Sequence, residues 1–547
     1  MGRSLFRLPG WGRFTSMVKL ALRRVVVITS VWPLTELYHA IYRLHVWYAL
    51  RTLKEIPATR AIYLTRGVGS GAIAYGVSDI DMVTLGDWTD DQQAAAMKSL
   101  RRFSQLSPLF DATLWQHAHT IASMRHLYAT DFYYQFRFDQ GRGWKLMFGE
   151  DVIGTLPPVP ADRLAAGYYM DIRNWWGTFL ASAFGDGVTA RDAVFRHSIA
   201  YKTATEVLNK TSSLGRRELK HSRKEGLDLA LAEASGRDLE FLQRLKRGAE
   251  SRHLRFEGDI QDDTLQFLLR NLEGFHARLG QFPPFQPDAG VDMYVDAPAD
   301  EVLWTTAAKD HALKLVDHVK REWPSYRGAF LVPSISFFTM DDLMLLLEVD
   351  PAQPPRADQI RELCRLHAKA RTNVPQRVAL LLLLPQGAYQ LEVVSLMELW
   401  HQVICPVANP DVFHLLTRAE FVLDGKPRPP SLIRWTPFAA FLIDEELAVR
   451  REAMAKASSD PSMTSIELIR NLFRHLQLEI TQRSGLAGCA VVPLTPAAAQ
   501  RALRAGGAPE MPVGAFVEAY RSEMAGKPVD VTPLIPQLMA LFSQQPV

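Results

Sequence analysis

The sequence contains few cysteines, no long apolar run and no strong excess of charge of either sign. Its three cysteines, Cys364, Cys405 and Cys489, form no CxxC motif, which excludes a disulfide scaffold and favours buried thiols in a reducing compartment. The runs Val25–Val31 and Val378–Leu384 are well short of the about 20 apolar residues that cross a bilayer. The net charge of +3 creates no strong overall attraction to nucleic acid or anionic membranes, although local basic patches remain possible. We therefore expect a cytoplasmic protein with no membrane span.

The composition is that of a folded protein, with 48% hydrophobic and 22% charged residues. At roughly 150 residues per domain, the 547 residues correspond to three or four domains. The first residues are basic and contain Trp11 among scattered apolar positions. Two interpretations of this segment stay open: an amphipathic helix that lies at a membrane surface, or a segment that caps the first domain.

The first 150 residues alternate between helical and strand patterns. Hydrophobic periodicity predicts a helix between Pro33 and Pro57, and a glycine-rich loop at Arg66–Ser78 separates two expected strands, Ala61–Thr65 and Ile80–Leu85. The further elements expected here are a helix from a capping box at Thr89 and Gln92 through about Phe103, a third strand at Leu109–Trp115, and a hairpin of Phe132–Phe138 with Trp144–Phe148.

The order of elements recurs in the second half of the chain. Residues from about 160 to 280 have helical periodicity, and a Pro- and Phe-rich stretch at 281–290 marks a boundary. Beyond it the expected elements are helices at Ala312–Trp323 and Ala357–Ala370, strands at Ala329–Val332, Leu343–Val349 and Val378–Leu384, and a hairpin of Val412–Leu416 with Glu420–Leu423.

Short matches at nearly constant spacing indicate an internal duplication. Leu146–Gly149 resembles Val422–Gly425 at an offset of 276 residues, and Val194–His197 resembles Leu472–His475 at an offset of 278. Two near-equal offsets, together with a common order of elements, favour two copies of one fold over coincidence.

The segment with the clearest chemistry runs from Gly67 to Val83. Its glycines let backbone amides approach a polyphosphate, and the Ser70 hydroxyl can donate to a phosphate oxygen. Asp79 and Asp81 are two residues apart, so on a strand both carboxylates lie on one face. Two carboxylates on one face suit Mg²⁺, which binds one or two carboxylates together with substrate phosphates.

This segment resembles the DNA polymerase-beta-like nucleotidyltransferase superfamily. The resemblance rests on Val68-Gly69-Ser70, which matches its hG[GS] motif, and on Asp79-Ile80-Asp81-Met82, which matches its [DE]h[DE]h motif. It covers residues 60–150 closely and the following helices only in kind. The resemblance implies two Mg²⁺ ions, an NTP substrate, and transfer of its nucleoside monophosphate to a hydroxyl with release of pyrophosphate.

The family implies a third metal-binding carboxylate on a later strand of the same sheet. Asp111 is the main candidate, because it is an acid in the middle of an otherwise apolar strand. Asp139 and Glu150 are rivals, but both are expected at turns, where acids are common. An HxH pair at His117 and His119 lacks further ligands at zinc spacing.

The family also implies a lysine that points at the triphosphate from a helix beside the core. Ser198, Lys202 and Glu206 are four residues apart and share one helix face. We therefore expect Gly69, Ser70, Ser198 and Lys202 to bind the nucleotide. The alternative for Lys202 is an ordinary solvated ion pair with Glu206.

The second half lacks the residues of this site. Asp342 precedes Leu343–Val349 much as Asp81 precedes its strand, but Met340 stands where Asp79 would be. The loop before it, residues 333–339, contains no glycine, and Val378–Leu384 contains no carboxylate. A second copy of this kind cannot assemble a two-metal site.

The sequence thus predicts an α+β protein: a mixed sheet of the nucleotidyltransferase type plus a helical domain, duplicated with a degenerate second copy. The expected domains are a nucleotidyltransferase core with N-terminal helices at 1–160, a helical domain at 161–280, a degenerate copy at 291–440 and helices at 441–547. The expected activity is nucleotidyl transfer, with Asp79, Asp81 and Asp111 as catalytic and Mg²⁺-binding residues. The acceptor stays open among a small molecule, RNA, a protein and a second nucleotide. The alternative is a non-catalytic nucleotide-binding or scaffold protein on the same fold.

Overall fold

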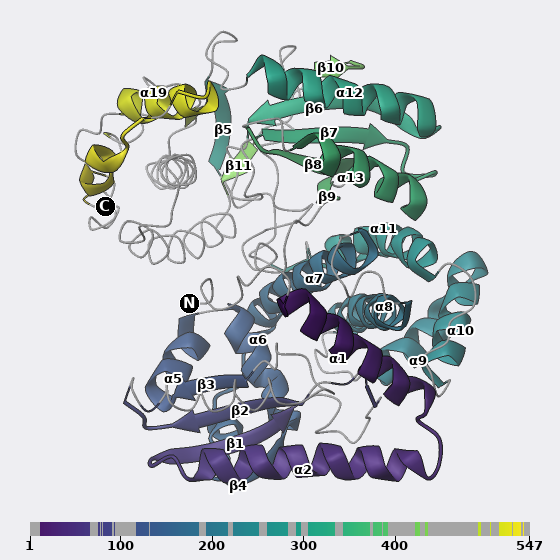
Figure 1. Ribbon diagram of the computed structural model, residues 1–547, viewed down its shortest axis with the longest axis vertical. Coiled ribbons are helices and arrows are strands. Elements are labelled where there is room, and N and C mark those ends of the chain that lie inside the picture. The colour runs from purple at the N-terminus through teal and green to yellow at the C-terminus, as the bar shows by residue number, and fades with distance from the viewer. Residues whose placement is uncertain are drawn as a thin grey trace. The chain divides into compact units, whose positions relative to one another are not determined.

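The computed structural model (Figure 1) describes residues 11–65, 75–76, 78, 80–89, 92, 116–130, 132–184, 193–216, 223–250, 260–279, 281–282, 291–296, 305–333, 343–371, 376–384, 387–391, 422–426, 433–435, 491–493, 504, 513–527, 529–537 and 540. The chain divides into two compact units, and both combine helices with mixed β-sheet. The first unit consists of Met1–Trp175 and Asp186–Leu268, and the second of Trp176–Gly185 and Leu269–Val547. The expected α+β class is confirmed at this level.

The first unit begins with a helical hairpin of α1 (Trp11–Ile28) and α2 (Leu34–Lys54). One stripe of α2, at the spacing of three and four residues that defines a helix face, is buried: Tyr42, Val46, Ala49 and Leu53. These side chains pack with Val26 of α1 against the apolar side chains of the sheet that follows. The helix expected between Pro33 and Pro57 is confirmed.

The first sheet has four strands in the order β3-β2-β1-β4. Their bounds are Thr59–Thr65 for β1, Asp81–Gly86 for β2, Gln116–Thr120 for β3 and Lys145–Gly149 for β4. Strand β1 is antiparallel to both β2 and β4, whereas β2 and β3 are parallel. Helix α2 lies along one face of this sheet, where Val26 of α1 joins the same core, and α5 (Ile121–Thr130) and α6 (Phe132–Gln140) contribute to the core on the other face (Figure 1).

The first strand of the hairpin expected in this region is wrong. The segment Phe132–Phe138 is helical and not a strand of a hairpin, because Tyr134 and Phe138, four residues apart, stack at 5.9 Å between ring centroids on one face of α6. The expected third strand, Leu109–Trp115, lies outside the described residues. The strand that pairs with β2 there is Gln116–Thr120, so His117 and His119 belong to the sheet itself.

The residues that follow the sheet are helical, as expected. The helices are α7 (Ala161–Phe184), α8 (Ala193–Arg216), α9 (Arg223–Glu233), α10 (Gly236–Glu250) and α11 (Ile260–Leu279). Short 3₁₀ turns at Gly141–Gly143 and Ile153–Thr155 lie before α7, on either side of β4.

The second unit contains a five-stranded sheet in the order β10-β6-β7-β8-β9. Its strands are β6 (Tyr326–Pro333), β7 (Leu343–Val349), β8 (Val378–Leu384), β9 (Gly387–Gln390) and β10 (Val422–Asp424). Helix α12 (Thr306–Glu322) precedes β6, and α13 (Ala357–Arg371) connects β7 to β8. The described part of Glu420–Leu423 belongs to β10, which pairs with β6; Val412–Leu416 lies outside the described residues.

The remaining described elements of this unit are a small sheet and C-terminal helices. The sheet has the order β11-β5-β12, with bounds Val291–Asp296 for β5, Ile433–Trp435 for β11 and Val491–Pro493 for β12. Helix α19 (Val513–Met524) and a 3₁₀ turn at Thr532–Leu534 follow.

Four strands have the same order and the same directions in the two larger sheets. Strands β8-β7-β6-β10 match β3-β2-β1-β4: the first pair is parallel, and the other two pairs are antiparallel in each. The second residue of β1, Arg60, donates to Asp87 just after β2 at 2.9 Å. The second residue of β6, Arg327, donates to Asp350 just after β7 at 2.6 Å.

The strands β4 and β10 also end alike. Gly149 and Gly425 both have positive φ, +81° and +97°. A Cβ atom on Gly149 would lie 1.7 Å from the carbonyl oxygen of Arg60, and one on Gly425 would lie 3.3 Å from that of Arg327. Glycine therefore permits the close approach of the neighbouring strand at both places.

The pairing of β6 with β7 corrects the sequence alignment of the two halves. In the first sheet Thr65 is opposite Asp81, and in the second the matching residue of β6, Val332, is opposite Met344. Met344 therefore occupies the position of Asp81, and Asp342 stands two residues earlier, where Asp79 stands in the first half. Sequence similarity alone could not decide between these two alignments. They differ by two residues, so both place the same side chains on the same face of the strand.

Candidate functional site

Three of the predicted site residues lie in described parts of the chain: Asp81, Ser198 and Lys202. Asp81 is the first residue of β2, and the other two lie on α8. Gly69, Ser70, Asp79 and Asp111 lie outside the described residues. The candidate site is therefore built from Asp81 and the segments that position it.

Asp81 is buried at the start of a strand. Asp81 is 8% exposed, and its partner in the neighbouring strand β1 is Thr65, which is 2% exposed. Side chains alternate along a strand, so Asp81 shares a face with Val83 and Leu85, which belong to the core that contains Tyr63. A carboxylate at the buried end of such a face is stable only with hydrogen bonds or a cation.

The segment just before Asp81 is fixed by α1 and α2. The Nε–H of Arg23 on α1 donates to the carbonyl oxygen of Gly76 at 2.9 Å. The Tyr42 hydroxyl on α2 accepts from the Gly76 amide at 3.3 Å and donates to the carbonyl oxygen of Ser78 at 2.8 Å. Both helices thus hold the backbone that joins the glycine-rich loop to β2.

Gly76 allows α1 to come close to this segment. Its φ is +80°, and a Cβ atom there would lie 2.8 Å from the carbonyl oxygen of Arg23 and 3.0 Å from a methyl group of Val27. A larger residue would displace either the helix or the segment. The ring of Tyr75, beside it, makes an edge contact with Tyr42, and the Tyr75 hydroxyl is hydrogen-bonded to Nδ1 of His39 at 3.1 Å.

The predicted nucleotide-binding residues of α8 lie close to a buried ion cluster. Ser198 is 2% exposed and Lys202 is half-buried. Glu206, the expected partner of Lys202 in the alternative interpretation, accepts from Lys210 at 2.6 Å. Lys210 is 1% exposed at its side chain and also pairs with Asp171 of α7 at 2.7 Å.

Lys210 was missed by the sequence analysis. The sequence pattern that could have predicted it is the pair Glu206 and Lys210, which are four residues apart on one helix. Burial alone would lower the pKa of Lys210, but the charges of Asp171 and Glu206 outweigh it and raise the pKa. The ammonium group also lies over the rings of Phe136 and Tyr168, at 5.7 Å and 5.9 Å from their centroids.

Both rivals of Asp111 are bound to arginines. Asp139, at the end of α6, accepts from Arg142 at 3.2 Å, and Glu150 accepts from Arg60 at 2.7 Å. Asp139 is buried and lies on α6, so the turn expected at this residue is wrong. These contacts give both acids structural roles.

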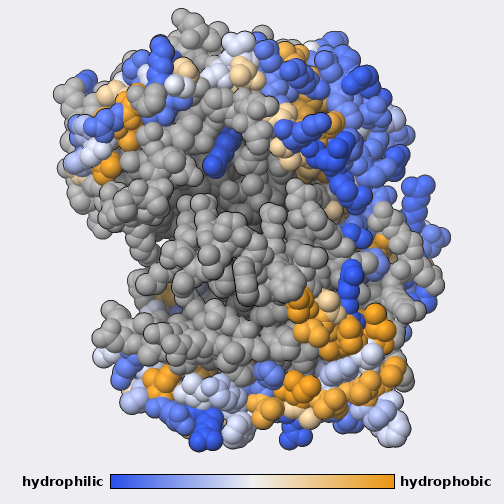
Figure 2. Space-filling model, viewed as in Figure 1, coloured by the Kyte–Doolittle hydropathy of each residue, from blue (hydrophilic) through white to orange (hydrophobic). Residues whose placement is uncertain are grey.

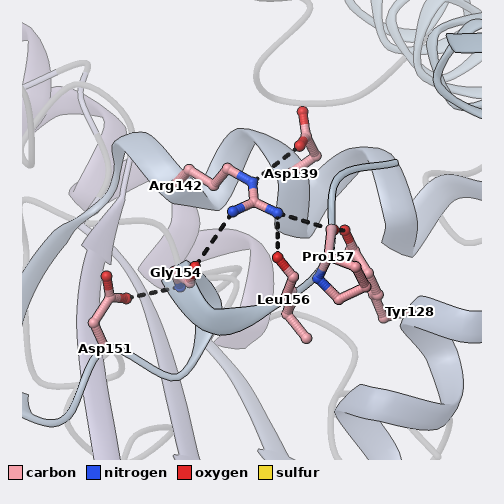
Figure 3. A network of polar contacts seen from close by, with 7 residues as sticks. All are labelled: Tyr128, Asp139, Arg142, Asp151, Gly154, Leu156 and Pro157. Atoms are coloured by element: carbon pink, nitrogen blue, oxygen red, sulfur yellow. Dashed lines mark hydrogen bonds and ion pairs between the residues drawn. The ribbon is translucent and has the colours of Figure 1, made fainter. Parts of the chain in front are cut away.

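Arg142 connects three elements (Figure 3). Besides Asp139, its guanidinium donates to the carbonyl oxygens of Leu156 at 2.6 Å and Pro157 at 2.9 Å, with a longer contact to Gly154 at 3.4 Å. The Tyr128 hydroxyl of α5 also donates to the Pro157 carbonyl. The network fixes the chain between β4 and α7 against α5 and α6.

Of the HxH pair, His119 has a described side chain on β3. His119 is flanked by Tyr134 and Phe138 in edge contacts at 5.7 and 5.9 Å between centroids. Burial among these rings lowers the pKa of His119 to about 4. The described residues bring together no group of three or more His, Cys, Asp or Glu that is suited to hold a metal ion; Asp79 and Asp111 are not among them.

The chain matches no protein-family model and no curated protein sequence.

Proposed function

We propose that this protein is a metal-dependent nucleotidyltransferase that moves a nucleoside monophosphate from an NTP to an acceptor hydroxyl. The observation that carries the proposal is the burial of Asp81 as the first residue of β2, directly after a segment that two helices fix. Carboxylate oxygens are ligands that Mg²⁺ prefers, so Asp81 fits the ion that the motif implies.

Each part of the site has a distinct task in this proposal. Asp79 and Asp81 would hold Mg²⁺, with Asp111 as the third carboxylate, and Gly69 and Ser70 would bind phosphate oxygens of the NTP. Bound Mg²⁺ supplies charge neutralisation at the triphosphate and lowers the pKa of the acceptor hydroxyl. Arg23 and Tyr42 act as positioning residues, because they hold the backbone at Gly76 and Ser78. Ser198 and Lys202 would contact the nucleotide from α8.

We also propose that the two units arose by duplication and that the second copy is degenerate. The shared order and directions of four strands support this, as do the matched pairs Arg60–Asp87 and Arg327–Asp350. Met344, which is fully buried, replaces Asp81 in the second sheet. A thioether there cannot replace a carboxylate as a Mg²⁺ ligand.

Pyrophosphate release from each NTP in the presence of Mg²⁺ tests the proposed activity. Asp79→Asn and Asp81→Asn should each abolish the release, and both variants should retain the wild-type circular dichroism spectrum. Asp342→Asn is the matched control: it removes an acid next to β7 and should leave turnover unchanged. NTP binding without pyrophosphate release in the wild-type protein would favour the non-catalytic alternative. Unchanged turnover in both site variants would refute the assignment.

A further inference from the structure

Most of the exposed large hydrophobic residues among the described ones lie on the α1–α2 hairpin. Eleven of the twelve exposed large hydrophobic residues in the described parts of the chain belong to residues 18–48, and the twelfth is Leu146 on β4. The exposed members on the hairpin are Val18, Leu22, Val25, Ile28, Val31, Trp32, Leu34, Leu37, Leu44, Trp47 and Tyr48. Figure 2 shows hydrophobic residues gathered over these two helices. A concentration of this kind marks an interaction surface.

Both helices carry an apolar stripe on each of two opposite faces. On α1, Val18, Leu22, Val25 and Ile28 recur every three or four residues and are exposed, whereas Val26 and Val27 are buried. On α2 the exposed residues Leu37, Leu44 and Tyr48 lie opposite the buried stripe. The buried stripes, which we call inner, belong to the core. The exposed stripes, which we call outer, are available to a partner.

The charge of the hairpin identifies the chemistry of that partner. Residues 1–56 contain nine Lys and Arg but only two Asp and Glu, whereas the other 491 residues contain 53 and 57. The net positive charge of the sequence is therefore concentrated in the segment that contains the two helices. Arg24, Arg43, Arg51 and Lys54 are exposed on the same helices.

Aromatic residues complete the pattern. Trp32 is 79% exposed at the turn of the hairpin, and Trp47 is exposed with the guanidinium of Arg51 5.6 Å from its ring centroid. Tryptophan, tyrosine and arginine suit the headgroup region of a bilayer, which offers both apolar and charged contacts. No described helix is long and apolar enough to cross a bilayer.

We propose that the outer face of the α1–α2 hairpin binds the surface of an anionic phospholipid membrane. The outer stripes would lie among the headgroups and upper acyl chains, and the basic side chains would contact lipid phosphates. The opposite face of α1 holds Gly76, so bound lipid would stay away from the candidate site.

Co-sedimentation of the 547-residue chain with vesicles tests this proposal. We expect binding to phosphatidylcholine vesicles that contain phosphatidylglycerol, much weaker binding to pure phosphatidylcholine, and a decrease at high salt. Ile28→Gln/Trp47→Gln should weaken partition by about tenfold or more, because it removes two large apolar side chains from the face. Arg43→Gln/Lys54→Gln should reduce only the difference between anionic and neutral vesicles.

Leu146→Gln is the matched control, since Leu146 is an exposed apolar residue on β4 and not on the hairpin. It should leave partition unchanged, and thermal unfolding should show that all variants are folded. Equal binding to neutral vesicles, or no binding to anionic ones, would overturn the proposal. A stable dimer in sedimentation velocity without lipid, which Ile28→Gln/Trp47→Gln dissociates, would overturn it in favour of a second copy of the chain.

Discussion

The guanidinium of Arg142 lies 3.2 Å from the carboxylate of Asp139, and the acid is the more buried member of the pair, with 4% of its side chain exposed against 28% for the arginine. The same guanidinium donates to carbonyl oxygens of Leu156 and Pro157. A single side chain therefore satisfies one buried charge and two backbone acceptors.

Replacing Arg142 should destabilise the first unit strongly. Arg142→Met leaves Asp139 buried without its cation, so we expect a loss of about 3 kcal/mol in the free energy of unfolding, measured by urea denaturation. Arg142→Lys should also lose stability, because an ammonium group cannot reproduce the planar fork of donors. The loss should be smaller than for Arg142→Met, because lysine keeps the positive charge beside Asp139. Arg142→Met/Asp139→Asn should recover part of the loss. Equal stability of Arg142→Met and wild type would contradict this account.

The ion cluster of α7 and α8 predicts an asymmetric response to substitution. Lys210→Met leaves Asp171 and Glu206 as adjacent buried carboxylates, and we expect a loss of about 3–5 kcal/mol. Lys210→Met/Asp171→Asn/Glu206→Gln removes all three charges and should regain most of it. Thermal unfolding of the three proteins is the measurement, and a triple variant no more stable than Lys210→Met would contradict the prediction.

The pH dependence of this cluster has a defined sign. The pKa of Lys210 is raised in the folded protein, so the contribution of its charge is fully present below the unfolded-state pKa and is lost as the pH rises through the folded value. Wild-type stability should therefore fall in strongly alkaline solution more steeply than that of the triple variant.

His119 should make the first unit sensitive to mild acid. Its folded pKa, about 4, is below the value of about 6.5 in an unfolded chain, so between them the unfolded state binds more protons and stability falls as the pH falls. From pH 7 to pH 5 the expected loss is about 2 kcal/mol. His119→Phe suits the contacts with Tyr134 and Phe138 and should remove this loss. The measurement is the urea midpoint of the wild-type protein and of His119→Phe at the two pH values. An equal decrease of the midpoint in both proteins would refute the role of His119.

The two strand-ending glycines should differ in their tolerance of a methyl group. Gly149→Ala places Cβ against the Arg60 carbonyl, so we expect the first unit to lose at least about 2 kcal/mol. At Gly425 the nearest atoms are 3.2 Å away, and Gly425→Ala should cost the second unit only about 1 kcal/mol, from its positive φ. Limited proteolysis of each unit distinguishes the two effects. The reverse order of sensitivity would show that the φ strain outweighs the clash.

Local patterns were enough to predict several of the described helices and strands. The bounds of β7 and β8 agree with Leu343–Val349 and Val378–Leu384, because continuous apolar runs between polar segments favour buried strands. The capping box at Thr89 and Gln92 is present, with hydrogen bonds of 3.0 and 3.4 Å in both directions. The strand prediction for Phe132–Phe138 was wrong because its aromatic residues recur at spacings of both two and four residues. These spacings fit a strand and a helix equally well.

Tertiary contacts were beyond the sequence patterns. Asp171 is 39 residues before Lys210, and only the packing of α7 on α8 brings them together. The bond from Arg23 to Gly76 likewise joins residues 53 apart. For the candidate site, the sequence predicted Asp81 at the start of a strand, and the structure adds its burial and the two helices that fix the preceding segment.

Strand β9 has a consequence for aggregation. The apolar strand β8 would be the edge of its sheet without β9, whose residues Gly387–Gln390 pair with Leu381–Leu384. An unpaired edge with so many leucines and no charge would template pairing with another chain. In the first sheet β3 is the last strand within the described ranges, and its sequence, Gln-His-Ala-His-Thr, is too polar to pose that hazard. Deletion of Gly387–Gln390 should therefore cause the second unit to form intermolecular sheets.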